Sequence, residues 1–125
     1  MLRLLRSTLL WILLLPYAVT FAGAGLNQLV LFANHDTFPV MENSWLVAKL
    51  AEVGKSQTAP DGTVMLDPVH CVMTSKTHLN FLADIIDLKT ATYSIGDGLI
   101  ELGEWMQAFC PFVWVALICD RVRRP

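Results

Sequence analysis

The chain has 125 residues, of which 54% are hydrophobic and 16% charged, with a formal net charge of −2 at pH 7 and a mean hydropathy of +0.51. Soluble globular domains carry about 25% charged residues, so this composition argues against a soluble protein. The sequence has no basic stripe and no glycine-rich phosphate loop, so nothing in it indicates nucleic-acid binding. Apolar residues concentrate near both ends, which predicts two membrane segments around a more polar middle region.

The first apolar segment runs from Ser7 to Ala33 without a charged residue. A helix rises about 1.5 Å per residue and the hydrocarbon layer is about 30 Å thick, so this segment is long enough to span a bilayer. Pro16 lies within it, and we expect a kink whose freed carbonyl finds a neighbouring partner. A cleaved signal peptide is the alternative, because "AGA" at 22–24 fits a cleavage site. The apolar run continues past that site, which favours an uncleaved transmembrane helix over residues 7–33.

The second apolar segment covers residues 94–119, and we predict that its transmembrane part lies mainly at 102–119. Glu101 and Glu104 set this register, since an acidic residue at the bilayer centre costs about 2.5 to 3.5 kcal/mol. Together with Asp97 they are spaced i, i+4, i+7 and share one helix face. That face is either solvated surface or a site for a cation, a proton or a partner. Ser94 and Asp97 form the S-x-x-D pattern of a capping box, which predicts the start of the helix.

Arginines flank the two segments at their outer ends. Arg3 and Arg6 precede the first segment, and the remaining three follow the second within residues 120–125. The positive-inside rule therefore predicts that both basic ends, residues 1–6 and 120–125, are cytoplasmic. Residues 34–93 would then form an extracytoplasmic domain. We expect a multi-pass protein of the cell inner (plasma) membrane.

The region between the two segments contains two helical patterns. "NSWLVAKLAEVG" has a serine suited to cap a helix and a terminal glycine, which predicts a short helix near 44–53. "SKTHLNFLADIIDL" has leucines and isoleucines at helical spacing, which predicts a second helix near 76–88. The stretch between them is extended at best, because Pro68 opposes a regular strand. The predicted fold class is mainly α, an integral membrane protein with two transmembrane helices joined by a small extracytoplasmic helical and irregular domain.

Groups with catalytic chemistry are few. The histidines, cysteines and acids show no H-E-x-x-H, H-x-x-x-H or C-x-x-C spacing, so we expect no metal site. Cys71 beside His70 is compatible with a nucleophile, but an activated thiolate needs an orienting environment, and we expect a surface thiol. Cys110 and Cys119 lie in the second segment, where cysteine behaves as a small apolar residue. We expect no enzyme activity, no catalytic residue and no cofactor.

Two stretches, "NHDTFPV" and "LNFLADIIDLKTATYSIGDGLIELG", carry motifs. The first is similar to an NGG-x-MPV-like motif, and the second to D-I-I followed by SIGD-x-L-I-x-x-G. Over about a third of the chain they resemble a bacterial (and phage-borne) integral-membrane family of unknown function. The resemblance implies a membrane protein and supplies no activity. The matching residues are Asn34, Phe38, Pro39, Val40, Leu82, Asp84, Ile85, Ile86, Ser94, Ile95, Gly96, Asp97, Leu99, Ile100 and Gly103.

The chain also departs from the pattern of that family. His35 and Asp36 stand where the family would have glycines, which puts the tight turn of those glycines in question. Residues 87–89 replace a proline-containing stretch. Glu101 and Glu104 acidify a helix that the family keeps apolar.

Two function classes follow from these observations. The first is a small membrane protein that acts by interaction with a partner at the cell envelope. The alternative is a phage-type membrane effector, either a holin-like pore former or a superinfection-exclusion protein. Membrane lipid, a membrane or envelope protein and a second copy of the chain are the candidate partners. The candidate interaction or motif residues are Asn34, Pro39, Asp84, Ser94, Asp97, Glu101 and Glu104.

Overall fold

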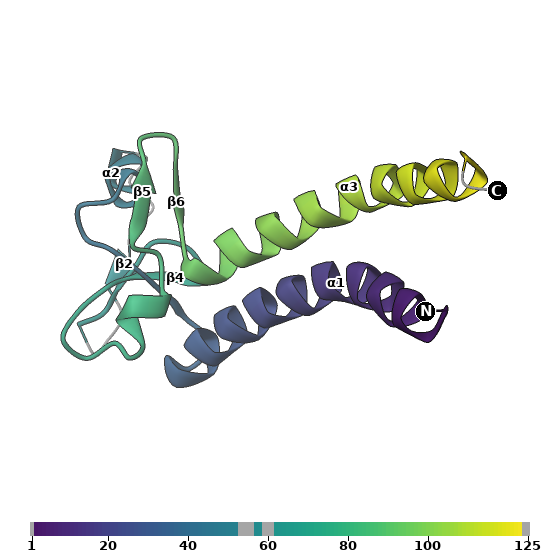
Figure 1. Ribbon diagram of the computed structural model, residues 1–125. Helices are drawn as coiled ribbons and strands as arrows, with labels where there is room; N and C mark the ends of the chain where they lie inside the picture. Colours follow the sequence, from purple (N-terminus) through teal and green to yellow (C-terminus); the bar gives the residue numbers. More distant parts are fainter. Residues whose placement is uncertain (1, 53–56, 59–61, 124–125) are drawn as a thin grey trace. The chain divides into compact units, whose positions relative to one another are not determined.

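The computed structural model describes residues 2–52, 57–58 and 62–123, with elements in the order α1, β1, α2, β2, β3, β4, η1, β5, β6, α3 (Figure 1). The chain divides into two compact units. The helical unit combines Met1–Ala22 with Leu99–Pro125, and the central unit is Gly23–Gly98. The long helices α1 and α3 contribute residues to both units, whereas the short elements all belong to the central unit.

The two long helices are α1 (Leu2–Ala33) and α3 (Ile95–Arg123). Within the described residues, Leu10–Ala33 and Ile95–Asp120 are long and apolar enough to cross a membrane. Only 11% and 6% of an apolar 18-residue part of these stretches is buried, whereas the core helix of a soluble protein would be mostly buried. The prediction of a mainly helical chain with two long apolar helices is confirmed. Both helices also continue into the basic flanks, beyond the predicted limits of 7 and 119.

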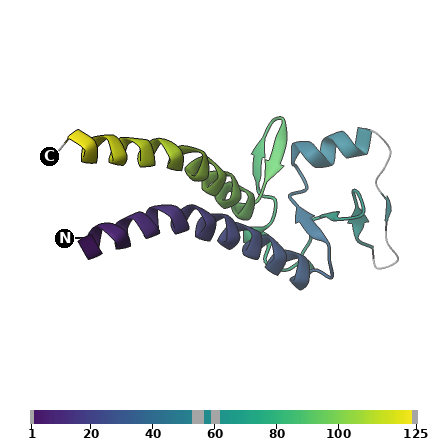
Figure 2. The ribbon, with the colours of Figure 1, turned by 90° about the vertical axis from the view of Figure 1, so that its right-hand side faces the viewer.

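Within the helical unit the two helical segments lie side by side (Figures 1 and 2). They approach closely at Gly103, where an added Cβ would lie 2.8 Å from both the Pro16 carbonyl oxygen and the Thr20 nitrogen. These are backbone atoms of α1, so they cannot rotate away. Gln107 Nε2 donates a hydrogen bond to Thr20 Oγ1 at 3.0 Å beside this contact. Glycine therefore sets the spacing of the helix pair at this level.

Pro16 interrupts the hydrogen bonding of α1 without ending the helix. Because proline has no N–H, the Ile12 carbonyl loses its usual helical donor. Cys110 Sγ, on α3, donates to the Ile12 carbonyl oxygen at 3.4 Å. Thr20 Oγ1 donates to the Pro16 carbonyl oxygen at 3.1 Å. The predicted partner for the freed carbonyl is confirmed, and it is a cysteine that we had expected to act only as a small apolar residue.

The central unit contains a four-stranded sheet with the strand order β1-β4-β3-β2. β1 (Phe38–Val40) pairs in parallel with β4 (His70–Val72). β4 is antiparallel to β3 (Val64–Met65), which is antiparallel to β2 (Gln57–Thr58). Strands of two or three residues cannot hold a sheet by pairing alone, so the packing of side chains beneath them has to contribute.

That packing joins the last turn of α1 to the sheet. Val30 of α1, Phe38 of β1 and Ala83 form the buried cluster, with relative exposures of 0%, 6% and 0%. Partly buried Leu31, Met73, Leu79 and Leu82 pack against it. Full burial of a side chain such as Phe38 contributes about 1.5 to 3 kcal/mol. The core therefore joins the end of α1 to the sheet within the central unit.

Two further elements complete the central unit. α2 (Trp45–Glu52) falls inside the range 44–53 predicted for a helix, and Val47 N–H donates to Ser44 Oγ at its start. β5 (Ile86–Leu88) and β6 (Ala91–Tyr93) form an antiparallel two-stranded hairpin, seen beside α2 in Figure 1. The central unit is thus a small mixed domain, richer in strands than the helical and irregular domain that we expected.

The prediction of a helix near 76–88 is wrong. A 3-10 turn, η1 (Asn80–Leu82), and strand β5 occupy this segment instead. Leu79 has a positive φ of 55°, which interrupts any helix at that point. Asp84 then uses its backbone in the sheet, because its N–H donates to the Pro39 oxygen and its oxygen accepts from Met41 N–H. Tertiary hydrogen bonds therefore override the helical spacing of the apolar residues.

The turn after α1 keeps a glycine-like shape although it contains no glycine. His35 and Asp36 have φ values of 54° and 64°, in the left-handed region that costs an L-residue about 1 to 2 kcal/mol. The Asp36 N–H donates to the Leu31 oxygen at 2.9 Å and closes the turn. We expect Asp36→Gly to raise the free energy of unfolding by up to about 1 kcal/mol, because relief of this strain exceeds the entropy cost of glycine.

Urea unfolding of the purified chain in detergent micelles measures this effect. Glu42→Gly is the matched control, since it also replaces an exposed acid and its φ is not positive. It should lower the free energy of unfolding by about 0.5 to 1 kcal/mol. A loss of the same size at Asp36 would show that the turn carries no strain.

Candidate functional site

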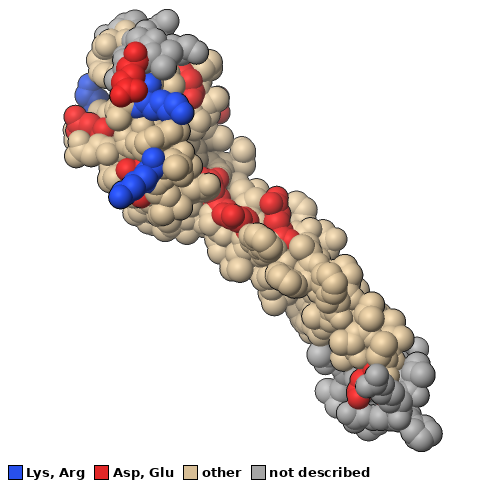
Figure 3. Space-filling view, turned by 90° about the horizontal axis from the view of Figure 1, so that it is seen from above, with Lys and Arg blue, Asp and Glu red and all other residues tan. Residues whose placement is uncertain are grey.

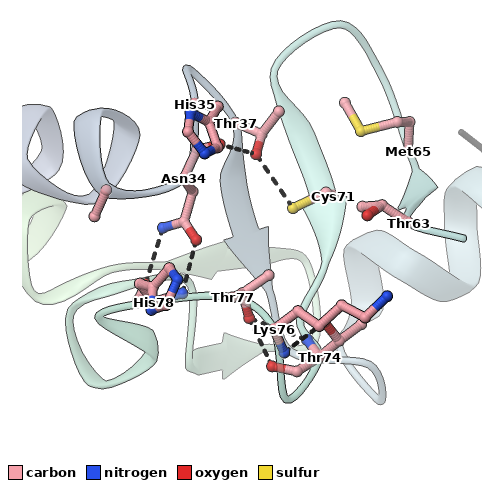
Figure 4. Close-up of a pocket in the computed structure, with 11 residues that line it drawn as sticks. Asn34, His35, Thr37, Thr63, Met65, Cys71, Thr74, Lys76, Thr77 and His78 are labelled. Carbon is pink, nitrogen blue, oxygen red and sulfur yellow. Dashed lines mark hydrogen bonds between the residues drawn. The ribbon is translucent and has the colours of Figure 1, made fainter. Parts of the chain in front are cut away.

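Asn34, the first residue after α1, lines a pocket of about 440 Å³ in the central unit (Figure 4). Its side chain is buried, with a relative exposure of 8%. Nδ2 donates to the Val30 and His78 oxygens at 2.8 and 2.9 Å, and Oδ1 accepts from the His78 N–H at 2.7 Å. This double contact with the His78 backbone holds the strained Leu79 that follows. The geometry gives Asn34 a structural role.

The same pocket contains Cys71, which we had expected as a surface thiol. The structure corrects this, because Cys71 is 1% exposed on the central strand β4. Its Sγ lies 3.7 Å from Thr37 Oγ1 in a hydrogen-bond contact (Figure 4). The sheet order places β4 between two other strands, which the sequence alone does not reveal.

The predicted capping box at the start of α3 is confirmed. Asp97 N–H donates to Ser94 Oγ at 3.0 Å, and Ser94 N–H donates to Asp97 Oδ2 at 2.9 Å. Both residues also contact Asn27, a residue of α1 that sequence reasoning missed. Asn27 Nδ2 donates to Asp97 Oδ1 at 2.7 Å, and the Ser94 hydroxyl lies 2.9 Å from Asn27 Oδ1 and 2.8 Å from Asp97 Oδ2. The hydroxyl has one proton, so it donates to one of these oxygens at a time.

Gly96 makes this network fit. A Cβ added there would lie 2.7 Å from the Gly23 oxygen and would collide with the Asn27 side chain. Within the central unit, the start of α3 therefore lies against the α1 backbone through a glycine and a serine. The S-I-G-D motif at 94–97 combines a helix cap with a helix–helix contact.

Asp84 and Asp97 line a second pocket in the central unit, with a volume of about 500 Å³. Residues from α1, β1, α2, β4 and β6 supply the rest of its wall. The polar lining residues are Asn27, Gln28, His70, Asp84, Thr92 and Asp97, and the others are Leu31, Phe38, Trp45, Leu46, Val69 and Ala91. The fold thus brings two acids, separated by thirteen positions in the motif region, to one pocket.

His70, on the wall of this pocket, is oriented by Asp67. Its Nδ1 lies 2.7 Å from Asp67 Oδ2, and its backbone N–H donates to Asp67 Oδ1 at 2.8 Å. Burial alone would raise the pKa of Asp67, but hydrogen bonds from the His70 and Val69 N–H groups and from the His70 ring outweigh it and lower the pKa. The Asp67 carboxylate is therefore charged, and it holds His70 in one orientation.

The Asp84 carboxyl has the opposite environment. It is 4% exposed and accepts no hydrogen bond from any residue that the structure describes. Burial, and then the negative charge of Asp97, raise its pKa from 3.8 to about 7, while His70 acts in the lowering direction. Folding thus favours the protonated carboxyl. This contribution to stability is complete below about pH 4 and is lost as the pH rises through about 7.

The remaining predicted residues do not join this pocket. Pro39 is buried in β1 next to Asp84, where its carbonyl accepts the Asp84 N–H at 3.1 Å. Glu101 and Glu104 are exposed on α3 in the helical unit, whereas Asp97 turns toward Asn27. All three acids lie on α3 at the spacing i, i+4, i+7, but their surroundings differ. Across the described residues, no group of three or more His, Cys, Asp or Glu side chains is placed to hold a metal ion.

Of the comparisons with known proteins, the comparison with protein families gives a match. A family model described as a family of unknown function (DUF5317) matches residues 8–108, which include the two pockets and the contacts of Gly96 and Gly103 with α1. No curated protein and no solved structure matches the chain. Since the match covers most of the sequence, the chain belongs to the DUF5317 family of unknown function.

Proposed function

We propose that the protein is a two-span protein of the cell inner membrane, with both termini in the cytoplasm, that binds a membrane or envelope protein through its central unit. One observation carries this proposal. The β5–β6 hairpin lies outside both candidate spans and exposes Ile86 and Leu88, with relative exposures of 43% and 56%. Large apolar side chains exposed next to each other outside a membrane favour a protein contact.

The hairpin has one attached face and one open face. Side chains alternate along a strand, so Ile86 and Leu88 project opposite to Asp87. Asp87 Oδ1 accepts from the Trp45 N–H of α2 at 3.1 Å and from Thr92 Oγ1 at 3.4 Å. The Asp87 face is therefore fixed to the central unit, and the apolar face is left for a partner. An isolated two-stranded hairpin is marginally stable in water, so a partner would also stabilise it.

The acidic excess of this region indicates the charge that a partner would carry. Residues 34–104 carry ten acids against four lysines. Figure 3 shows the helical part as a largely uncharged surface, with the charged side chains mostly elsewhere on the face in view. A partner that offers an apolar strip bordered by basic residues would complement the hairpin.

The contacts of α1 support an uncleaved first span. Removal of residues up to the "AGA" site at 22–24 would take away Pro16 and Thr20, which contact Gly103, and the Ile12 carbonyl that accepts from Cys110. A protein folded around these contacts depends on the segment that a signal peptidase would remove.

Photo-crosslinking in cell membranes tests the proposal. With a benzophenone amino acid in place of Leu88, we expect one discrete crosslinked product, and with the same amino acid in place of exposed Thr74 we expect none. The double variant Ile86→Ser with Leu88→Ser should reduce copurification of that product's protein at least about tenfold, while its free energy of unfolding changes by less than about 0.5 kcal/mol.

Exposed Phe81 provides the matched control, because Phe81→Ser removes an apolar surface group outside the hairpin. It should leave the crosslink unchanged. Equal crosslinking at residues 74 and 88, or an unchanged yield in the double variant, would contradict the proposal. Growth arrest with membrane depolarisation on expression would instead indicate the pore-forming alternative.

A further inference from the structure

Asp84 is a buried acid that the fold leaves without a protein partner. A carboxyl at 4% exposure normally accepts hydrogen bonds or pairs with a cation, because burying an unpaired charge is costly. The neighbouring acid Asp97 accepts such hydrogen bonds, since the Asn27 side chain and the Ser94 N–H donate to its two oxygens. The contrast within one pocket indicates that Asp84 is open to a ligand.

The pocket itself favours an organic ligand over a metal ion. Its volume of about 500 Å³ lies in the range of small-molecule sites, roughly 300 to 1,000 Å³, and far exceeds a single ion. No cluster of three or more metal-ligating side chains occurs among the described residues. Leu31, Phe38 and Leu46 give the wall an apolar side, while Asn27 and Thr92 add neutral polar groups.

The charges around Asp84 select the sign of the ligand. Asp97 adds a second negative charge from α3, and His70 on β4 is held by Asp67. The basic group of α2, Lys49, does not line the pocket, although its Nζ lies 4.4 Å from the centroid of the Trp45 ring, which does. The pocket therefore attracts a cation, and an anion would meet two acids.

We propose that this pocket binds a small organic cation, with a primary ammonium group on Asp84 and an apolar body against Leu31, Phe38 and Leu46. The ammonium group supplies the hydrogen-bond donors that Asp84 lacks. A lipid headgroup and a soluble amine share this chemistry. The proposal is independent of partner binding at the hairpin.

The protonation of Asp84 makes binding pH-dependent. The ammonium group binds the carboxylate, so binding at low pH must first release a proton. With a pKa of about 7, the carboxylate fraction, and with it the affinity, should fall about tenfold between pH 8 and pH 6. His70 also lines the pocket and acts to lower the pKa of Asp84, so the same titration of His70→Gln checks that the pH dependence belongs to Asp84.

The test titrates the full chain, in nonionic detergent micelles, with 2-phenylethylamine and its neutral analogue 2-phenylethanol. The NMR signal of the Trp45 indole N–H reports occupancy of the pocket. At pH 8 we expect the amine to bind at least about tenfold more tightly than the alcohol. Asp84→Asn should weaken amine binding at least about tenfold, while the variant unfolds no more easily than the parent chain, because a neutral side chain suits the burial.

The matched control is Glu42→Gln, which removes the same charge at an exposed position of the central unit that does not line the pocket. Amine affinity should stay within about twofold. The proposal is overturned if the amine does not bind at pH 8, if amine and alcohol bind equally, or if Asp84→Asn binds the amine as tightly as the parent chain.

Lipid nanodiscs then distinguish the two sources of the ammonium group. If the natural ligand is a lipid headgroup, phosphatidylethanolamine nanodiscs should weaken probe binding compared with phosphatidylcholine nanodiscs, which have the same net charge but no ammonium N–H donor. If probe binding is as tight in phosphatidylethanolamine as in phosphatidylcholine, the ligand is a soluble amine.

Discussion

Replacing Asn34 with alanine is expected to lower the free energy of unfolding by about 2 to 4 kcal/mol. The change removes three hydrogen bonds of a buried side chain, two of them to the backbone of His78. Each is worth about 0.5 to 1.5 kcal/mol net, and the partners left behind are the Val30 carbonyl in α1 and the backbone of His78. The left-handed Leu79 would also lose the support of the anchored His78 backbone that precedes it.

Urea unfolding in detergent micelles, followed by near-UV circular dichroism, measures the loss. Asn43→Ala is the matched control, since Asn43 is exposed in the turn before α2. It should change the free energy of unfolding by less than about 0.5 kcal/mol. Asn34→Asp should be destabilised like the alanine variant, because a carboxylate would face the oxygens of Val30 and His78. Similar values for residues 34 and 43 would refute the structural role of Asn34.

Gly103→Ala is expected to destabilise the helix pair by about 1 to 3 kcal/mol. A Cβ there would stand 2.8 Å from two backbone atoms of α1, the Pro16 oxygen and the Thr20 nitrogen. The helices would have to move apart, which would also lengthen the hydrogen bond from Gln107 to Thr20. The effect opposes ordinary helix propensity, by which alanine is favoured over glycine by about 1 kcal/mol.

The same helix provides the control, because a Cβ added at Gly98 meets nothing within 4 Å. Gly98→Ala should therefore be neutral or stabilising by up to about 1 kcal/mol. Unfolding in mixed micelles of increasing sodium dodecyl sulfate content compares the variants. If both alanine variants shift the midpoint equally and in the same direction, the close approach at Gly103 does not exist.

Much of the fold could be predicted from local and periodic patterns in the sequence. The uncharged run around Pro16 and the apolar run of α3 predicted the two long helices, because length and hydropathy are properties of one segment. The pattern of Ser94 and Asp97 predicted a capping box three residues wide. The need of the carbonyl freed by Pro16 for a partner followed from proline chemistry, although its donor, Cys110, did not.

The sheet and the pocket depend on contacts between distant segments and left no local signal. Parallel pairing of β1 with β4 involves three residues in each strand, too few for an alternating pattern. The apolar spacing from Leu79 onward suggested a helix because the hydrogen bonds that prevent it come from Asn34 and Pro39. Asp84 and Asp97 were chosen from a motif, but only the fold gives them Asn27 and His70 as neighbours.

Cysteine labelling in spheroplasts tests most directly the claim of two spans with the central unit outside. Native Cys71 cannot report it, because it is buried, so Ser75→Cys supplies an exposed thiol and Pro125→Cys a thiol at the C-terminus. With the parent chain as background, we predict that a membrane-impermeant maleimide labels Ser75→Cys in intact spheroplasts and Pro125→Cys only after lysis. Protection of Ser75→Cys until lysis, or labelling of Pro125→Cys in intact spheroplasts, would contradict the account.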